Sequence, residues 1–166
     1  MKRLLIVLCV ATSALLVSGA VALAGDSGSS GGEVHVYGVS TTGGNASQII
    51  ITGAIAARGE TRNVSENIGM VTTPNGTFKV NLRELNHASG TGGVNQKTCS
   101  GAFTATAPIT LFDGTGAYKN IKGTIKLTAT FAAIFSKTDT GACNAGPTAN
   151  PRTALSFFQG QGKVSF

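Results

Sequence analysis

The sequence predicts an all-β fold, an antiparallel barrel of about eight strands, with a β-sandwich as the alternative. Several segments alternate apolar and polar residues with a period of two, which is typical of strands with one buried face. No segment shows a convincing helical period. The 23 glycines among 166 residues lack the three-residue repeat of collagen and suit the corners and tight turns of a barrel.

The N-terminus has the organisation of an export signal. Lys2 and Arg3 precede an apolar run at residues 4–16, and small residues at Ala22 and Ala24 suit a signal-peptidase site. We expect a signal peptide at 1–24 cleaved near Ala24, a flexible lead-in at 25–32 and a barrel domain at 33–166. The apolar run is too short for a comfortable membrane span, so no integral membrane segment is expected after processing, and the alternative is an uncleaved anchor. The protein is therefore expected to be secreted, to the extracellular space or the cell envelope.

The charge of the chain argues against a nucleic-acid partner. After removal of residues 1–24, eleven basic and seven acidic residues remain, a net charge of +4. The basic residues are scattered singly, and the chain has no Trp and only two Tyr, whereas nucleic-acid binders gather charge beside aromatic platforms. Weak attraction to anionic cell-surface polymers is the most that this charge indicates.

Two cysteines remain after the signal, Cys99 and Cys143. An even pair in an exported chain predicts one disulfide, and closing a loop of this length contributes about 4 kcal/mol in the chain-entropy model. The alternative, a metal pair or two free thiols, is weaker because His35 and His87 have no ligand-like spacing to the cysteines. We therefore expect no metal site and no cofactor.

The first half of the domain reads as strands separated by polar connections. Residues 33–40 alternate, and residues 47–58 contain a β-branched run that favours a strand. Gly53 within that run indicates a bulge or a barrel corner. Residues 59–66 are expected to be a polar connection.

A hairpin is predicted next, with arms at residues 67–73 and 77–85. Asn75 and Gly76 supply the strongest short-range turn signal, because both tolerate positive φ. The following residues, 86–97, are expected to form a long mobile loop of the kind often found at the mouth of a barrel.

The stretch from residue 99 to 135 is predicted to be the central unit of the barrel. It contains two long strands joined by a glycine-rich connection at residues 113–123. Pro108 lies in the first of these strands and requires an edge position or a bulge. A polar loop is expected at 136–154 and a last strand at 155–166.

The connection itself is predicted to be a structural corner rather than a ligand loop. Gly114, Gly116 and Gly123 allow tight turns, while Tyr118 and Ile121 are spaced to plug one end of a barrel. This pattern, followed by a long amphipathic strand, resembles the corresponding stretch of the dirigent and allene oxide cyclase-like barrels.

The resemblance extends over residues 49–166, including residues 51–59, which are similar to an early barrel strand of the group. It implies an eight-stranded antiparallel barrel, and such barrels commonly form trimers, so a homo-oligomer is expected. In character the chain is nearer to uncharacterised secreted bacterial barrels of this type than to the plant enzymes. Those families need polar residues inside the barrel for chemistry, whereas the inward faces expected here are apolar, so no catalytic residue is transferred.

Two isolated polar residues are candidates for a functional role. Glu84 is the least implausible functional carboxylate, at the end of a strand, and His87 lies in a loop; for both, a solvated surface position is the favoured interpretation. The catalytic residues therefore stay unknown, and the sequence favours a protein that is not an enzyme without deciding the question.

Three functions are compatible with these observations. The favoured one is a secreted, non-catalytic barrel that binds a small apolar ligand or a cell-surface partner, because many inward positions are Ala or Gly and leave room for a cavity. The first alternative is an isomerase- or dirigent-like protein that steers a reactive intermediate, which would need Tyr37, His35 or Glu84 to point inward. The second alternative is a structural envelope protein.

Overall fold

The computed structural model describes residues 31–41, 46–146 and 149–166. The predicted signal peptide, its cleavage point and most of the lead-in lie outside these residues. The strands are β1 Gly31–Thr41, β2 Ser47–Gly53, β3 Ala57–Ser65, β4 Ile68–Thr73, β5 Gly76–Asn81, β6 Thr91–Asn95, β7 Ser100–Phe112, β8 Lys122–Ile134 and β9 Thr153–Ser165. A short helix, α1, spans Arg83–Asn86, and a 3₁₀ turn, η1, spans Gly116–Tyr118.

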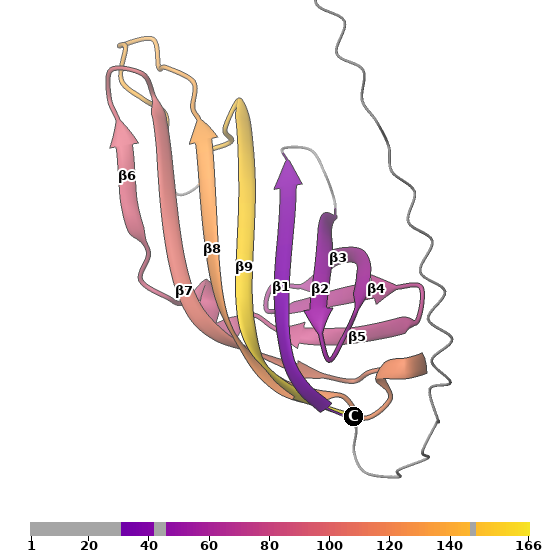
Figure 1. Cartoon of the computed structure of the whole chain (residues 1–166). Helices are drawn as coiled ribbons and strands as arrows, with labels where there is room; N and C mark the ends of the chain where they lie inside the picture. Colours follow the sequence, from indigo (N-terminus) through magenta and orange to yellow (C-terminus); the bar gives the residue numbers. More distant parts are fainter. Residues whose placement is uncertain (1–30, 42–45, 147–148) are drawn as a thin grey trace, which may run out of the picture.

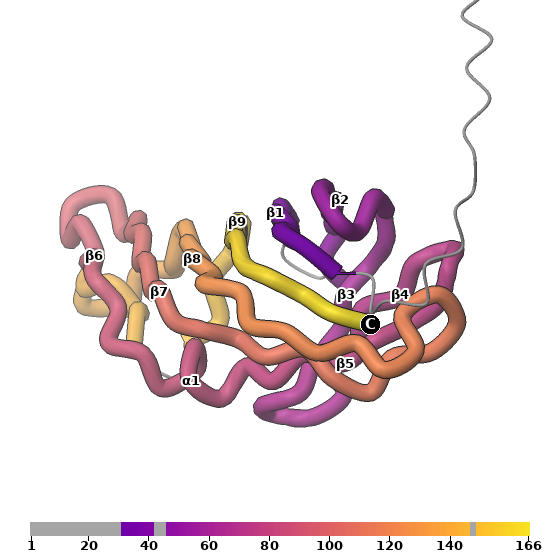
Figure 2. Tube along the Cα trace, turned by 60° about the horizontal axis from the view of Figure 1, so that its bottom comes forward, coloured from indigo at the N-terminus to yellow at the C-terminus, as the bar shows by residue number. Residues whose placement is uncertain are grey.

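Eight of these strands form a closed antiparallel barrel, which confirms the predicted fold class. Around the ring they follow the order β5, β4, β3, β2, β1, β9, β8, β7, and pairing of β5 with β7 closes it. β6 lies outside the ring, paired with the other end of β7. Figure 2 shows β3, β4 and β5 curling from β2 back towards β7.

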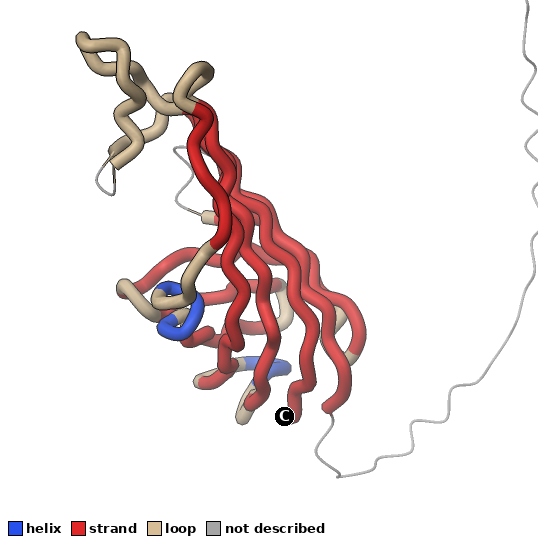
Figure 3. The backbone as a smooth tube through the Cα atoms, turned by 90° about the vertical axis from the view of Figure 1, so that its left-hand side faces the viewer, coloured by secondary structure: helices blue, strands red, loops and turns tan. Residues whose placement is uncertain are grey.

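Strand length divides the barrel into two halves. β7, β8 and β9 have 13 residues each and β1 has 11, whereas β2, β4 and β5 have six or seven. Figure 1 shows the long strands rising past the short ones, and Figure 3 shows them continuing beyond the ring as a single sheet. We call the ring that includes β2–β5 the closed half. The free ends of β7–β9, with β6 and the loop at residues 135–152, are the open half.

The main core lies in the closed half. It consists of apolar side chains from seven barrel strands, from the turn between β2 and β3 and from the connection between β7 and β8, and Ala57 of β3 packs against them. The buried residues are Val34, Ile49, Ile51, Ile55, Val71, Phe78, Val80, Ile109, Leu111, Tyr118, Ile121, Ile125, Leu127 and Val164. Alternate residues of a strand face the same side of a sheet, so the period-two patterns predict these positions. The alternation in residues 125–135 and 155–166 indicates the inward face that Ile125 and Leu127 of β8 and Val164 of β9 occupy.

A second, smaller core lies in the open half. Cys99, Ala133 and Phe135 are buried there, with Phe103 and Phe131 packed against them. The predicted disulfide between Cys99 and Cys143 is present, with 5.2 Å between the Cα atoms. It ties the loop at 135–152 to the start of β7.

The prediction of a polar connection at residues 59–66 is wrong, because residues 59–65 lie in β3. β2 ends at Gly53, whose φ is 95°, and the chain turns through residues 54–56 before β3 begins. Gly53 therefore occupies a corner, one of its two expected roles. β3 lies between β2 and β4, and ladder hydrogen bonds from two neighbours stabilise a polar segment as a strand.

The loop predicted at residues 86–97 also contains a strand, β6. The side-chain oxygen of Asn95 accepts hydrogen bonds from the backbone N–H groups of Lys97 and Thr98, at 2.9 and 3.2 Å. This local turn reverses the chain and brings β6 against β7. The segment has one apolar side chain, Val94, so its local pattern did not predict a strand.

The hairpin at residues 67–85 is present, but its second arm ends at Asn81. The side-chain oxygen of Asn81 accepts a hydrogen bond from the N–H of Arg83 at 3.0 Å, which turns the chain into α1. The sequence predicted no helix, and four residues are too few to show a helical period. The lead-in also ends earlier than expected, because Gly31 and Gly32 pair with β9 as part of β1.

Pro108 lies where β7 has a neighbouring strand on one side only. On that side it is opposite Lys126 of β8. On the other side, the pairing with β6 covers β7 as far as Thr104, and the pairing with β5 begins at Thr110. The expected edge position is confirmed, and the missing N–H of the proline interrupts no ladder in that gap.

Candidate functional site

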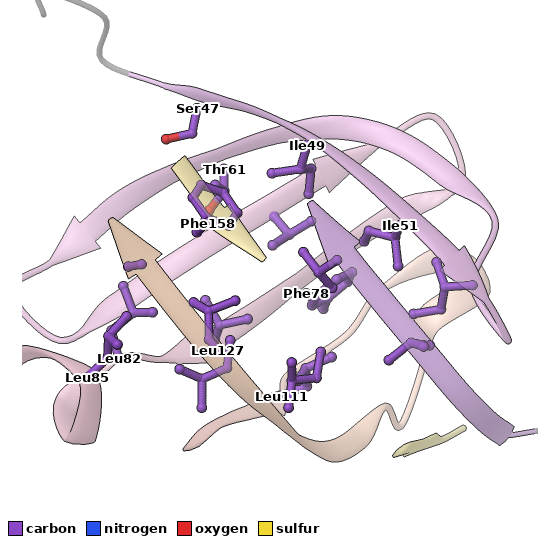
Figure 4. A pocket seen from close by; sticks show the side chains of 18 of the residues that line it. Ser47, Ile49, Ile51, Thr61, Phe78, Leu82, Leu85, Leu111, Leu127 and Phe158 are labelled. Carbon is purple, nitrogen blue, oxygen red and sulfur yellow. The ribbon is translucent and has the colours of Figure 1, made fainter. Parts of the chain in front are cut away.

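The closed half contains a cavity of about 180 Å³ with a largely apolar lining. Figure 4 shows its side chains converging on a common space from strands on all sides. The apolar lining residues are Val34, Val36, Ile49, Ile51, Ile55, Val71, Phe78, Val80, Leu82, Leu85, Ile109, Leu111, Ile125, Leu127, Ala129 and Phe158. A cavity of about 150 Å³ lined by comparable side chains stays dry and binds benzene, so this space is large enough for a small apolar molecule.

The inward glycines of β9 do not create this space directly. A Cβ atom at Gly160 would lie 2.8 Å from both Ile125 Cγ2 and Leu127 Cδ1. The side chains of Ile125 and Leu127 on β8 therefore occupy the space next to Gly160 on the neighbouring strand β9. Gly160 thus permits close packing between β8 and β9, and Ile125 and Leu127 line the cavity from this side.

Three polar side chains lie together at one end of the cavity, and we call them the polar rim: Ser47, Thr61 and Asn63. Ser47 on β2 is directly opposite Thr61 on β3, and Asn63 is two residues further along the same face of β3. Within the described parts of the chain, no hydrogen bond engages these three side chains. In Figure 4, Ser47 and Thr61 lie at the same end as Phe158.

Phe158 lies at the mouth, between two small residues. The sheet register places Gly38 of β1 and Ala129 of β8 on either side of it. A Cβ atom at Gly38 would collide with the ring of Phe158, so the ring lies directly over that glycine. The half-buried Phe158 packs against the main core and lines the cavity.

The opposite end of the barrel is blocked by Tyr118. Its ring is 4% exposed and meets Phe78 edge to face, with 5.3 Å between the ring centroids. Its hydroxyl forms a 2.9 Å hydrogen bond with the hydroxyl of Thr73, the buried polar residue of this end. Phe166 also packs against Tyr118, with 6.3 Å between the ring centroids.

The predicted corner glycines surround this plug. Gly116 has a φ of 60°, which a residue with a side chain rarely adopts, and it opens the turn that carries Tyr118. A Cβ atom at Gly114 would collide with the carbonyl oxygen of Tyr118, and one at Gly123 with that of Lys163. The backbone can pass this closely only where the side chain is absent.

The polar residues singled out in the sequence lie away from the cavity. His35 and Tyr37 face outward on β1, where they line a shallow groove with Lys126, Gln159 and Gln161. Glu33 lies 3.8 Å from the imidazole of His35 on the same outer face.

The two residues considered near α1 are exposed as well. Glu84 lies within the helix and His87 directly follows it. Of the ionisable side chains in residues 31–41, 46–146 and 149–166, none lines the cavity. These same ranges contain no cluster of three or more His, Cys, Asp or Glu side chains that could hold a metal ion.

An apolar strip that the sequence pattern did not indicate runs along the outer face of β1, β9 and the free end of β8. Tyr37, Val39, Leu155, Phe157 and Ile134 are each between 42% and 46% exposed. Val39 is opposite Phe157 across the β1–β9 pair, so the strip continues from strand to strand. These residues alternate with the inward positions, and apolar residues on both faces of a strand weaken its period-two pattern.

The polar rim was also missed. Thr61 and Asn63 lie in the segment interpreted as a connection, so their side chains had no assigned face. On this part of β3 the inward residues are polar while Val64 faces outward, so hydrophobic alternation gives the wrong orientation. The signal that could have identified them is the pairing of β3 with β2, which opposes Thr61 to Ser47.

Comparisons with protein-family models, with curated proteins and with solved structures gave no match for this chain. The resemblance to the dirigent and allene oxide cyclase-like barrels therefore stays a prediction. Among the helices of the described residues, none is long and apolar enough to cross a membrane.

Proposed function

We propose that this protein is a non-catalytic binding barrel that takes a small apolar molecule into the cavity of its closed half. The observation that carries the proposal is the cavity itself, about 180 Å³ and walled by aliphatic and aromatic side chains. Apolar pockets of this kind bind ligands because transfer of apolar surface out of water is favourable. The disulfide supports a secreted or envelope location, where thiols oxidise.

The position of the polar residues favours binding over chemistry. The isomerase- or dirigent-like alternative needs a polar group inside the barrel, and it named Tyr37, His35 and Glu84. His35 and Tyr37 line the groove on the outer face, and Glu84 is exposed on α1. The other functions expected from the sequence, a surface partner, an envelope component and a trimer, stay predictions.

The first test is a panel of small apolar molecules, such as benzene, toluene and naphthalene, added to the purified protein during thermal unfolding. A ligand present at a hundredfold excess over its dissociation constant stabilises the folded state by about 2.7 kcal/mol. We expect at least one member to raise the melting temperature by several degrees. A panel without any stabilisation, together with unchanged methyl NMR spectra, would contradict the proposal.

A matched pair of variants on β1 locates the binding site. Val36 lines the cavity, whereas Val39 faces outward and is 42% exposed. We expect Val36→Phe to occupy the cavity and abolish the ligand-dependent shift, and Val39→Phe to preserve it. Retained binding in folded Val36→Phe would place the ligand elsewhere. If that variant does not fold, Ala129→Leu at the mouth serves the same purpose.

A further inference from the structure

The polar rim gives the cavity two chemically different ends. The closed end has apolar side chains such as Phe78, and the Tyr118 plug that packs against Phe78 has its hydroxyl engaged with Thr73. The other end has the side chains of Ser47, Thr61 and Asn63 on one continuous face of β2 and β3. A ligand seated in the cavity therefore meets apolar surface along its body and hydrogen-bonding groups at one end.

The rim groups are available to a ligand. Within the described residues, none of the three side chains makes a hydrogen bond to the protein, and no buried polar side-chain atom lacks a partner. The rim groups are thus reached by solvent in the free protein. A ligand that replaced this water with an apolar end would leave hydroxyl and amide groups unsatisfied, which is costly.

The absence of charged side chains among the described residues that line the cavity disfavours a ligand with an ionised head group. Residues adjacent to the rim on β3 point to the opposite face, where Glu60 accepts a hydrogen bond from Gln48 at 2.8 Å. No described cationic or anionic side chain lines the cavity. A carboxylate or an ammonium group would lose hydration at the rim without gaining a counter-ion.

We propose that the ligand is an uncharged molecule with one hydrogen-bonding group, an alcohol or a carbonyl compound, on a ring or short chain that fills the cavity. This inference rests on the proposed function and specifies its ligand class. Thr61 is the specificity residue at the centre of the rim, since it lies opposite Ser47 and next but one to Asn63. Its hydroxyl binds the polar group of the ligand.

The test compares three ligands with the same ring: cyclohexanol, methylcyclohexane and cyclohexanecarboxylate, titrated at pH 7 and followed by methyl NMR. We expect Thr61→Val, which keeps the shape of the side chain, to weaken cyclohexanol about fivefold and to leave methylcyclohexane unchanged, since a neutral hydrogen bond is lost only with the alcohol. The carboxylate should bind the wild-type protein more than about tenfold more weakly than cyclohexanol. The matched control is Thr72→Val, because Thr72 is exposed on the outer face of β4, opposite Glu60.

The outcomes separate this inference from the function on which it rests. If the first two ligands bind and Thr61→Val affects both equally, or neither, the inference is overturned and the apolar-binding function stands. Equal affinity for the carboxylate and the alcohol overturns it as well. If none of the three ligands binds the wild-type protein, both fail. Asn63→Ala repeats the comparison should Thr61→Val not fold.

Discussion

One strand, β8, passes through both halves of the barrel, and its inward face shows how differently they are stabilised. In the closed half Ile125 and Leu127 are 2% and 6% exposed. The next inward residues, Ala129 and Phe131, are only half-buried. Burial returns at Ala133, beneath the loop held by the disulfide. The mouth of the cavity thus coincides with the gap between two separate cores.

The difference between the halves has a topological cause. The closed half buries its side chains because eight strands surround them, and each strand adds contacts from a distant part of the chain. The open half is a single sheet, and among the described residues it is the loop carrying Cys143 that packs on its inner face. A covalent link substitutes there for the packing that the ring supplies in the closed half.

The largest expected effect comes from opening the closed end. Tyr118→Ala should lower the free energy of unfolding by about 4 kcal/mol, because it removes a buried ring and leaves a cavity. Urea unfolding of the purified protein measures this change. The matched control is Tyr37→Ala, on the outer face at 45% exposure, which should cost less than about 1 kcal/mol. Similar losses for the two tyrosines would contradict the assignment of Tyr118 as the plug.

Removal of the disulfide should have the next largest effect, concentrated in the open half. Replacing Cys99 and Cys143 together with Ala should cost between about 2 and 4 kcal/mol. Amide hydrogen exchange should accelerate in β6 and in the adjoining end of β7 more than in β4 and β5, because the link lies beside the former pair. Uniform acceleration throughout the barrel would show that the two halves unfold as one unit.

The smallest effect is expected at the mouth, where two adjacent phenylalanines face opposite sides. Phe158→Ala should cost about 2 kcal/mol, less than a fully buried phenylalanine, because its ring is half-buried over Gly38. Phe157→Ala, on the outer strip at 43% exposure, should change stability by less than about 0.5 kcal/mol. Thermal unfolding of both variants checks the difference, and equal values would contradict the assigned faces.

Sequence reasoning succeeded where one residue pattern was sufficient. The alternation in residues 125–135 predicted which side chains of β8 face the core, and Asn75-Gly76 predicted the turn between β4 and β5. The two cysteines of the domain left one possible intramolecular disulfide. The alternation and the turn depend on the geometry of neighbouring residues, and the disulfide depends on the chemistry of cysteine. All three can therefore be recognised without knowledge of the tertiary structure.

Sequence reasoning failed where a segment takes its structure from a distant partner. β3 is polar on both faces near Arg62, and β6 contains two glycines and one valine, so neither has a strand pattern of its own. Both segments are strands because their backbone N–H and C=O groups form hydrogen bonds with those of the neighbouring strands, β2 and β7.

The sequence by itself determined an all-β chain with alternating strands, a disulfide and a glycine-rich corner around Tyr118. Only the tertiary structure decided where the ring closes, because the pairing of β5 with β7 joins residues 79–81 to residues 110–112. The same is true of the cavity and its polar rim, which bring Ser47 opposite Thr61 across two strands. Alternation specifies which side of a strand is buried, whereas the strand neighbours decide what the buried side meets.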